Sequence, residues 1–232
     1  MSEKNIMQCA CPYIAIQPDY MPLANGEAFP WHYVSHLPDF ITAKGDAEAK
    51  RITSVKTFHG DNTFFVLFEC KDPCIWGLKS KHNDPISDEE VVEVFLSPDP
   101  DSGYYYEFEL SPANVRFAAL VKNHGSPDWE NIEKYLDCSR MKTSVEIEGK
   151  INEPQFSSRG WSAIIGIPFS MMGLEKPPEN GDVWRGNFYR IDRPHPEKPD
   201  MFEHEFSCWS PTLTDPPAFH RPDKFGRIIF ER

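Results

Sequence analysis

The sequence predicts an all-β protein built as a β-sandwich, with one or two short helices. Many short segments show the period-two alternation or the brief apolar run that is typical of β-strands. The chain has 232 residues, 22 of them Pro and 13 Gly, and most of these lie between the strand-like segments. Helical periodicity is nearly absent. Strands broken by turns at this spacing predict two packed antiparallel sheets.

The length suits one large all-β domain with a substantial core. Residues 1–30 contain Pro12, Pro18, Pro22 and Pro30, and we expect this segment to be irregular and packed on the domain. Residues 31–232 show no repeat and no composition shift that would mark a boundary. We therefore expect them to form a single β-sandwich.

The first strand pair is predicted at Arg51 to His59 and Thr63 to Lys71, joined by a turn at Gly60, Asp61 and Asn62. The second segment reads TFFVLFECK and has apolar side chains on both faces. A strand that is apolar on both faces is expected in the middle of a sandwich or beneath a further layer.

A second hairpin is predicted at Val91 to Ser97 and Tyr104 to Leu110, with a broad tip of Asp, Pro, Ser and Gly between them. One short helix is predicted over Asp128 to Cys138, because Asp128 can cap it and an apolar stripe follows. The remaining predicted strands are Asn114 to Lys122, Lys142 to Lys150, Gly160 to Pro168, Gly181 to Asp192, His204 to Ser210 and Phe225 to Glu231.

The charge excludes two classes of partner. Lys and Arg number 24 against 36 Asp and Glu, which gives a formal net charge of −12. No basic surface is expected, so nucleic acid and anionic membranes are not expected partners. No apolar run approaches the roughly 20 residues of a membrane-spanning helix.

The first residues, MSEKNIMQCACPYIAIQPDY, lack the apolar run of a secretory signal. We therefore expect a cytoplasmic protein as the chain is given, or an exported one if a leader was removed. The six cysteines form no CxxC pair, and their spacing does not suit a zinc site. Free thiols are expected.

Oxygen-rich loops suit calcium, and the tip of the second hairpin contains Asp99 and Asp101. These two residues are the candidate calcium ligands in the sequence. Asp is also a frequent turn residue, which would explain the same positions without a metal.

No nucleophile, metalloprotease, phosphate-loop or dinucleotide motif is present. Glu107 and Glu109 lie two apart on a predicted strand, so they share a face about 7 Å apart, close to the carboxyl spacing of glycosidases. Their alternation with Tyr106, Phe108 and Leu110 favours a half-exposed strand with a solvated polar face. A binding protein is therefore favoured over an enzyme.

The C-terminal region has the richest recognition chemistry. The segment Gly181 to Asp192 reads GDVWRGNFYRID, and it places Tyr189 and Arg190 where planar groups could hydrogen-bond and stack. A Pro-rich loop then brings Trp209 and Phe219 within reach, and Trp76 lies in an earlier loop. Aromatic loop residues on a rigid sandwich are typical of binding sites, and sugars combine an apolar face with hydroxyls.

Several motifs in order extend this interpretation. They are Glu69-Cys70-Lys71-Asp72, Glu90 to Leu96, Tyr105 to Phe108, Trp161 to Phe169, Gly186-Asn187-Phe188, Trp209-Ser210-Pro211 and Lys224-Phe225-Gly226. From about Trp31 onward the chain resembles the family 9 carbohydrate-binding modules, in particular the single-domain "family 9-like" proteins of the DOMON-like group. The resemblance implies an immunoglobulin-like or jelly-roll sandwich, structural calcium, and non-catalytic binding of a sugar or polysaccharide, including at chain ends, in a carbohydrate catabolic process.

The resemblance also implies positions for the site. Glu93 matches an acidic residue that bonds sugar, Tyr189 falls where the family has an amide, and Phe219 falls at the second stacking Trp. Ile86 and Ser87 occupy the place of the first stacking Trp, and Trp76 lies upstream of it. The candidate sugar-binding residues are Trp76, Glu93, Tyr189, Arg190, Trp209 and Phe219.

Two other functions remain open from the sequence. DOMON-type relatives include cytochrome domains, so a haem or redox module is one alternative. Its candidate axial ligands are Met171, Met172, His195, His204 and His220. A glycan-active hydrolase that uses Glu107 and Glu109 is the other.

Overall fold

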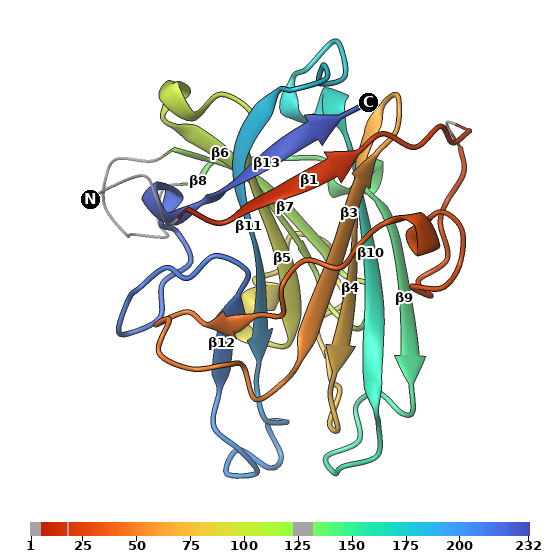
Figure 1. The fold of residues 1–232 in the computed structure, drawn as a ribbon. Helices are drawn as coiled ribbons and strands as arrows, with labels where there is room; N and C mark the ends of the chain where they lie inside the picture. Colours follow the sequence, from red (N-terminus) through yellow and green to blue (C-terminus); the bar gives the residue numbers. More distant parts are fainter. Residues whose placement is uncertain (1–5, 18, 123–131) are drawn as a thin grey trace.

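The computed structural model describes residues 6–17, 19–122 and 132–232, and these residues fold as a β-sandwich (Figure 1). The predicted all-β architecture is confirmed. The helical elements in this part of the chain are short 3-10 turns: η2 (Trp31–Tyr33), η3 (Ile86–Asp88), η4 (Pro100–Ser102), η5 (Cys138–Arg140), η6 (Phe169–Met172) and η7 (Pro222–Lys224).

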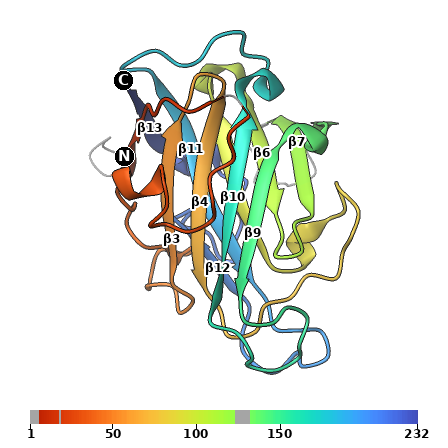
Figure 2. The ribbon, with the colours of Figure 1, turned by 90° about the vertical axis from the view of Figure 1, so that its right-hand side faces the viewer.

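Within the described part of the chain, the smaller sheet has four antiparallel strands in the order β3-β4-β10-β9, which lie side by side in Figure 2. They are β3 (Thr53–His59), β4 (Thr63–Lys71), β10 (Gly160–Pro168) and β9 (Lys142–Glu148). β3 and β4 form the predicted hairpin, with Thr53 opposite Cys70 and His59 opposite Phe64.

The larger sheet has nine strands among the described residues, with β1-β13-β11-β5-β6-β7-β8 as its main order. They are β1 (Gln8–Pro12), β2 (Ile41–Thr42), β5 (Val91–Ser97), β6 (Tyr104–Leu110), β7 (Arg116–Lys122), β8 (Ile132–Tyr135), β11 (Val183–Asp192), β12 (Glu205–Cys208) and β13 (Gly226–Glu231). β11 pairs with β5 along one edge. Along its other edge it pairs first with β13 and then with β12.

The main core lies between the two sheets. Alternate residues of the central strands point into it, such as Val66 and Phe68 of β4 and Val94 of β5, all fully buried. The other face of β4 is buried as well, through Phe65 and Leu67. The apolar character of both faces of this strand is therefore explained by a third layer, which covers the face turned away from the main core.

That third layer is the N-terminal segment. Trp31 is fully buried and packs edge-on against Phe58, with ring centroids 4.9 Å apart. Lys56 is buried beneath the segment, and its Nζ donates to the carbonyl oxygens of Gly26 and Trp31 at 2.9 and 3.2 Å. These hydrogen bonds give the buried ammonium group its acceptors, and they hold the segment against the outer face of the smaller sheet.

Two local expectations were wrong. The first residues are not wholly irregular, because β1 pairs in parallel with β13 and extends the larger sheet. The helix expected over Asp128 to Cys138 is not formed in its described part: Ile132–Tyr135 is strand β8, antiparallel to β7, while residues 128–131 lie outside the described residues. Pairing with a sheet edge outweighs the local helical pattern in this segment.

The six cysteines are all buried and none forms a disulfide. Among the described residues, no helix is long and apolar enough to span a membrane.

Candidate functional site

The outer face of the larger sheet, the face turned away from the smaller sheet, concentrates polar and aromatic side chains. Period-two alternation places Glu93 of β5, Glu107 and Glu109 of β6, and Tyr189 of β11 on this face. The strand register puts Tyr189 opposite Glu93, and Glu93 opposite Glu109. Three neighbouring strands therefore present one row of ionisable and aromatic groups.

The loop between β12 and β13 folds over this row. Phe219 stacks on Tyr189 with ring centroids 4.2 Å apart and an interplanar angle of 19°. The Tyr189 hydroxyl donates to the Phe219 carbonyl oxygen at 3.0 Å. The stacked rings and this hydrogen bond together hold the loop against the sheet.

His220 continues the same loop and reaches β6. Its Nδ1 lies 2.6 Å from the hydroxyl of Tyr105, and its Nε2 lies 4.0 Å from Oε1 of Glu107. The ring also lies against Phe95, with centroids 5.2 Å apart. The imidazole thus lies between the aromatic rings of Phe95 and Tyr105 and the carboxylate of Glu107.

Sheet and loop enclose a cavity of about 170 Å³. Its walls are Ser87, Glu93, Glu107, Glu109, Ile191, Phe206, Pro217, Ala218, Phe219 and His220. One side is aromatic, formed by Phe206 and Phe219, whose centroids are 5.8 Å apart. The sheet side is acidic.

The carboxyl groups of Glu93, Glu107 and Glu109 form a carboxylate triad, with one oxygen of each within 4.8 Å of the others. Burial raises the pKa of all three, and the negative neighbours raise the pKa of Glu93 and Glu109 further. His220 acts in the opposite direction on the pKa of Glu107. Oε2 of Glu109 has no hydrogen-bond partner in the structure.

The interpretation of Glu107 and Glu109 as a solvated polar face was wrong. Their residues are 5% and 3% exposed, because the loop after β12 covers the sheet. The alternation of β6 is real, but its polar face lines a cavity and not the bulk solvent.

Arg193, just beyond β11, forms the far end of the site. Its guanidinium donates twice to the carbonyl oxygen of Ser87, at 3.2 and 3.0 Å, and lies 5.2 Å from the ring centroid of Phe206. Its positive charge opposes the rise in the pKa of Glu93. Ser87 stands where the family resemblance places a stacking Trp, so this wall of the cavity is small and polar.

Three of the six candidate sugar-binding residues meet at this site: Glu93 and Phe219 line the cavity, and Tyr189 supports Phe219 from behind. Arg190 and Trp209 do not. Arg190 is fully buried between the sheets, where it pairs with Asp72 at 2.7 Å. Trp209 is 1% exposed and packs in the main core against Phe188.

Trp76 also lies away from the cavity. It is 5% exposed, its Nε1 donates to the carbonyl oxygen of Arg193 at 2.7 Å, and its ring packs edge-on against His195. The loop that carries Trp76 is therefore fixed by burial, and its indole belongs to the packing at the end of β11.

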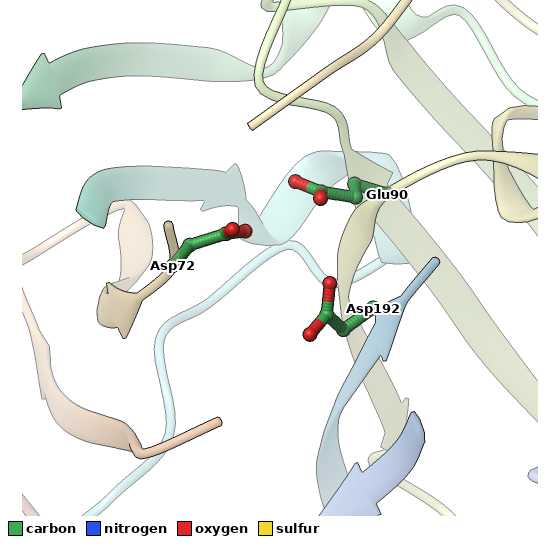
Figure 3. A group of neighbouring side chains, drawn as sticks. All are labelled: Asp72, Glu90 and Asp192. Carbon is green, nitrogen blue, oxygen red and sulfur yellow. The ribbon is translucent and has the colours of Figure 1, made fainter. Parts of the chain in front are cut away.

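Asp99, one of the two candidate calcium ligands, caps a turn. The Asp99 side chain accepts a hydrogen bond from the backbone N–H of Asp101 at 3.2 Å and caps η4. Among the described residues, the carboxylate groups close enough to share an ion lie elsewhere: the triad above, and a second group of Asp72, Glu90 and Asp192, which point toward one another in Figure 3.

The candidate haem ligands are engaged in separate places. Met171 and Met172 belong to the main core. His195 packs on Trp76, and Nδ1 of His204 lies 2.8 Å from the Arg193 guanidinium, so only His220 of the five lines the cavity.

The sequence interpretation named His220 for the haem alternative and Glu107 and Glu109 for the hydrolase alternative, but it left all three out of the sugar-binding residues. A signal was present, because Tyr105, Glu107 and Glu109 alternate on one face, and Glu93 on the neighbouring strand has the same spacing. Arg190 could have been excluded by the same rule, since it follows Tyr189 on the strand and must point to the opposite face.

The chain has relatives among known proteins. The sequence profile of Carbohydrate-binding family 9 matches residues 52–230. A curated relative from Arthroderma benhamiae, described as an extracellular protein, is 28% identical over an alignment of 221 residues that covers 90% of each chain.

Two solved structures share the fold. One is from Bacteroides uniformis, described as a candidate carbohydrate-binding protein, with a TM-score of 0.78 and 19% identity over 98% of this chain and all of the other. The second is a carbohydrate-binding module of family 9 from Caldicellulosiruptor kristjanssonii in complex with glucose. Its TM-score is 0.62, with 17% identity over 97% of each chain.

Proposed function

The chain belongs to Carbohydrate-binding family 9 and is a carbohydrate-binding protein, and from that membership we propose that its sugar binds in the cavity formed by Phe219 and the carboxylate triad. The observation that supports this assignment most directly is the pairing of an aromatic wall with acidic groups in one cavity. The Caldicellulosiruptor module, which shares the fold, was solved with glucose.

The two sides of the cavity suit the two sides of a sugar ring. Phe219 supplies apolar aromatic surface against which the C–H groups of a ring can pack, and its stacking on Tyr189 holds it in place. The carboxyl oxygens of Glu93 and Glu109 accept hydrogen bonds from hydroxyl groups. Because burial and neighbouring carboxylates raise the pKa of both groups, each favours its protonated form, and a protonated carboxyl also donates a hydrogen bond to a sugar oxygen.

The size of the cavity favours a chain end. About 170 Å³ is below the roughly 300–1,000 Å³ of sites for larger ligands. One sugar residue fits such a volume better than the middle of an extended chain. We therefore propose that a terminal residue of an oligosaccharide enters the cavity and the rest of the chain lies outside.

Isothermal titration calorimetry tests the proposal with glucose, xylose and their β-1,4-linked oligomers. We expect one binding site and an affinity that changes little beyond a disaccharide. Reduction of the end residue to an alditol distinguishes the two ends, because it opens only the ring at the reducing end.

Phe219→Ala and Phe156→Ala make a matched pair of variants. Phe219 lines the cavity, whereas Phe156 is 62% exposed and lies outside it. We expect Phe219→Ala to weaken binding at least about tenfold, the equivalent of 1.4 kcal/mol, and Phe156→Ala to leave it unchanged. Equal affinities for the two variants, or no heat with any sugar, would refute this site.

The arrangement of the carboxylate triad argues against catalysis. All three carboxyl groups of the triad converge on one spot on the sheet side of the cavity, whereas glycosidases place two carboxyl groups about 5–5.5 Å or more apart on either side of the bond. We propose binding without turnover. Aryl glycosides of the sugars that bind should release no aryl group during prolonged incubation.

A further inference from the structure

A second cavity, of about 210 Å³, lies on the outer face of the larger sheet. It is lined by Ser97 at the end of β5 and by Arg185 near the start of β11, whereas Glu93, four residues earlier on β5, lines the sugar cavity. Four strand residues span about 13 Å, so the two cavities lie at opposite ends of one face. Tyr105 lines the second cavity and its hydrogen-bonding partner His220 lines the sugar cavity, so this pair of side chains separates the two.

Arg185 gives this second cavity, here called the Arg185 cavity, a half-buried positive charge. Its Nη2 donates to the carbonyl oxygen of Phe225, and its buried Nε has no hydrogen-bond partner in the structure. In the described part of the chain, no salt bridge joins Arg185 to a carboxylate, because Asp223, which also lines the cavity, pairs with other residues. Buried N–H groups are nearly always hydrogen-bonded, so the free Nε indicates a missing acceptor.

A second arginine increases the need for a negative group. Arg227 of β13 is the register partner of Arg185 on β11. Directly opposed residues of antiparallel strands project from the same face, with Cβ atoms about 4.5–5.5 Å apart, and like charges there repel one another. Burial and the charge of Arg227 lower the pKa of Arg185. An anion bound between strand and loop would relieve this repulsion.

Asp223 does not fill that role. Its two carboxylate oxygens accept hydrogen bonds from Nε and Nη2 of Arg221 at 2.8 and 2.9 Å, and Nζ of Lys224 lies 3.5 Å from Oδ2. The bond to Arg221 is the main cause of a lowered pKa of Asp223. This carboxylate is thus neutralised by its neighbours in the loop, and Arg185 still lacks an acceptor.

The remaining walls suit a sugar ring. The rings of Tyr105 and Phe225 meet edge-on with centroids 5.3 Å apart, and Pro222 adds apolar surface beside them. Oγ of Ser97 donates to the carbonyl oxygen of Tyr104 at 3.0 Å, so its lone pairs are left to accept a hydrogen bond from a hydroxyl group. The volume of the cavity suits one ring, as in the sugar cavity.

We propose that the Arg185 cavity binds an acidic sugar residue, a uronic acid, and that Arg185 bonds its carboxylate. Such a ligand combines a ring that these walls accept with the planar pair of oxygens that a guanidinium group binds well. The three carboxyl groups of the sugar cavity disfavour an anion there. The chain would therefore bind neutral and acidic sugars at opposite ends of one sheet face.

NMR titration of the full ¹⁵N-labelled chain tests the proposal with glucuronate and glucose, which differ only at C6. Glucuronate should shift the amide signals of residues 97–105 and 222–227, and glucose should not. Arg185→Gln should weaken glucuronate binding at least about tenfold, because it removes the charge and the guanidinium donors. Arg159→Gln is the matched control and should bind glucuronate like wild type, since Arg159 pairs with Glu148 at the surface of the smaller sheet.

Two further variants separate this site from the sugar cavity. Phe219→Ala should keep its affinity for glucuronate, and Arg185→Gln should keep its affinity for glucose, which also shows that the variant folds. Arg227→Gln changes an exposed residue and should weaken glucuronate binding roughly two- to fivefold. Loss of glucose binding alone would refute the sugar cavity under Phe219 and leave the Arg185 cavity standing.

Phosphate and acetate distinguish an acidic sugar from a simple anion. Weaker binding of both than of glucuronate supports the proposal, whereas equal binding of either would mean an anion site without a sugar and would overturn it. Three further results would also overturn it: equal affinities for glucose and glucuronate, full glucuronate binding by Arg185→Gln, and loss of glucuronate binding in Phe219→Ala. If Arg185→Gln does not fold, the wild-type shifts and the Arg227→Gln affinity decide the matter.

Discussion

Arg190 shows how one strand position can be decisive for stability. It is fully buried between the sheets and donates to Asp72, to the hydroxyl of Thr53 and to the carbonyl oxygen of Lys71. Removing one partner of a buried ion pair leaves an uncompensated charge, which is more damaging than losing the pair itself. Here Asp72 would be left beside two further carboxylates.

We therefore predict that Arg190→Met lowers the free energy of unfolding by about 3–5 kcal/mol, measured by urea titration in EDTA. Arg159→Ala serves as the control, because Arg159 pairs with Glu148 at the surface, where both side chains are more than half exposed. The control should unfold at the wild-type urea midpoint. A similar loss in both variants would contradict the distinction between the buried and the exposed pair.

Glu109 carries a prediction about pH. Burial and two negative neighbours raise its pKa well above the ordinary value, whereas in the unfolded chain it should titrate near 4.3. The folded state therefore binds the proton more tightly. The stability that this group supports is fully present below about pH 4, and it declines as pH rises through the raised pKa.

Glu109→Gln should consequently gain stability relative to wild type as pH increases, by at most about 1.4 kcal/mol per pH unit. Urea unfolding at pH 4, 6 and 8 in EDTA measures the difference. Glu203→Gln, at a side chain that is 90% exposed, is the control and should show no such trend. A Glu109→Gln difference that stays constant with pH would contradict the raised pKa.

The sequence was informative about residues that share a strand face and poor about residues brought together by the loop. Glu93 was predicted as a site residue from the family resemblance, Tyr189 from its strand as well, and the two face the same side of the larger sheet. His220 and Glu107 meet only because the loop after β12 folds back onto β6. No local sequence pattern predicts that this loop folds back onto β6.

At the scale of elements, the strands with strong alternation were predicted well. β4 and β5 occupy the expected ranges, because their apolar residues have one way to reach the core. β1 and β8 were missed for the same physical reason: both lie at edges of the larger sheet, where tertiary pairing outweighs intrinsic preference. The sequence alone predicts that residues 8–12 are irregular, and they form a strand because β13 pairs with them.

The N-terminal segment supports a prediction at this scale. Trp31 covers the outer face of the smaller sheet and touches Phe58, and its Nε1 donates to the carbonyl oxygen of Leu23 at 3.0 Å. Trp31→Ala should lower the free energy of unfolding by about 3–5 kcal/mol, as expected when a large buried aromatic side chain is removed.

Tyr33→Ala is the matched control, since Tyr33 lies in the same 3-10 turn and is 69% exposed. Urea unfolding should give Tyr33→Ala a midpoint near that of wild type. If Trp31→Ala were equally stable, the segment would not be a third layer of the fold but an accessory to the sandwich.

At the scale of the molecule, the outer face of each sheet is covered by a segment of the chain that lies mostly outside the strands. The N-terminal segment buries the smaller sheet, and the loop between β12 and β13 buries part of the larger one. The loop between β12 and β13 leaves a cavity beneath it, where the sheet presents three glutamates in place of apolar side chains. The sandwich thus gains a binding site where its outer packing is incomplete.

The two carboxylate groups lie on opposite faces of the larger sheet, although Glu90 directly precedes β5, which carries Glu93. The pKa of Glu90 responds to Asp72, Asp192 and Arg190, whereas that of Glu93 responds to Glu107 and Arg193. Neither cluster influences the other in these interactions. A shared strand is a rigid support and not a route of coupling unless it has two arrangements.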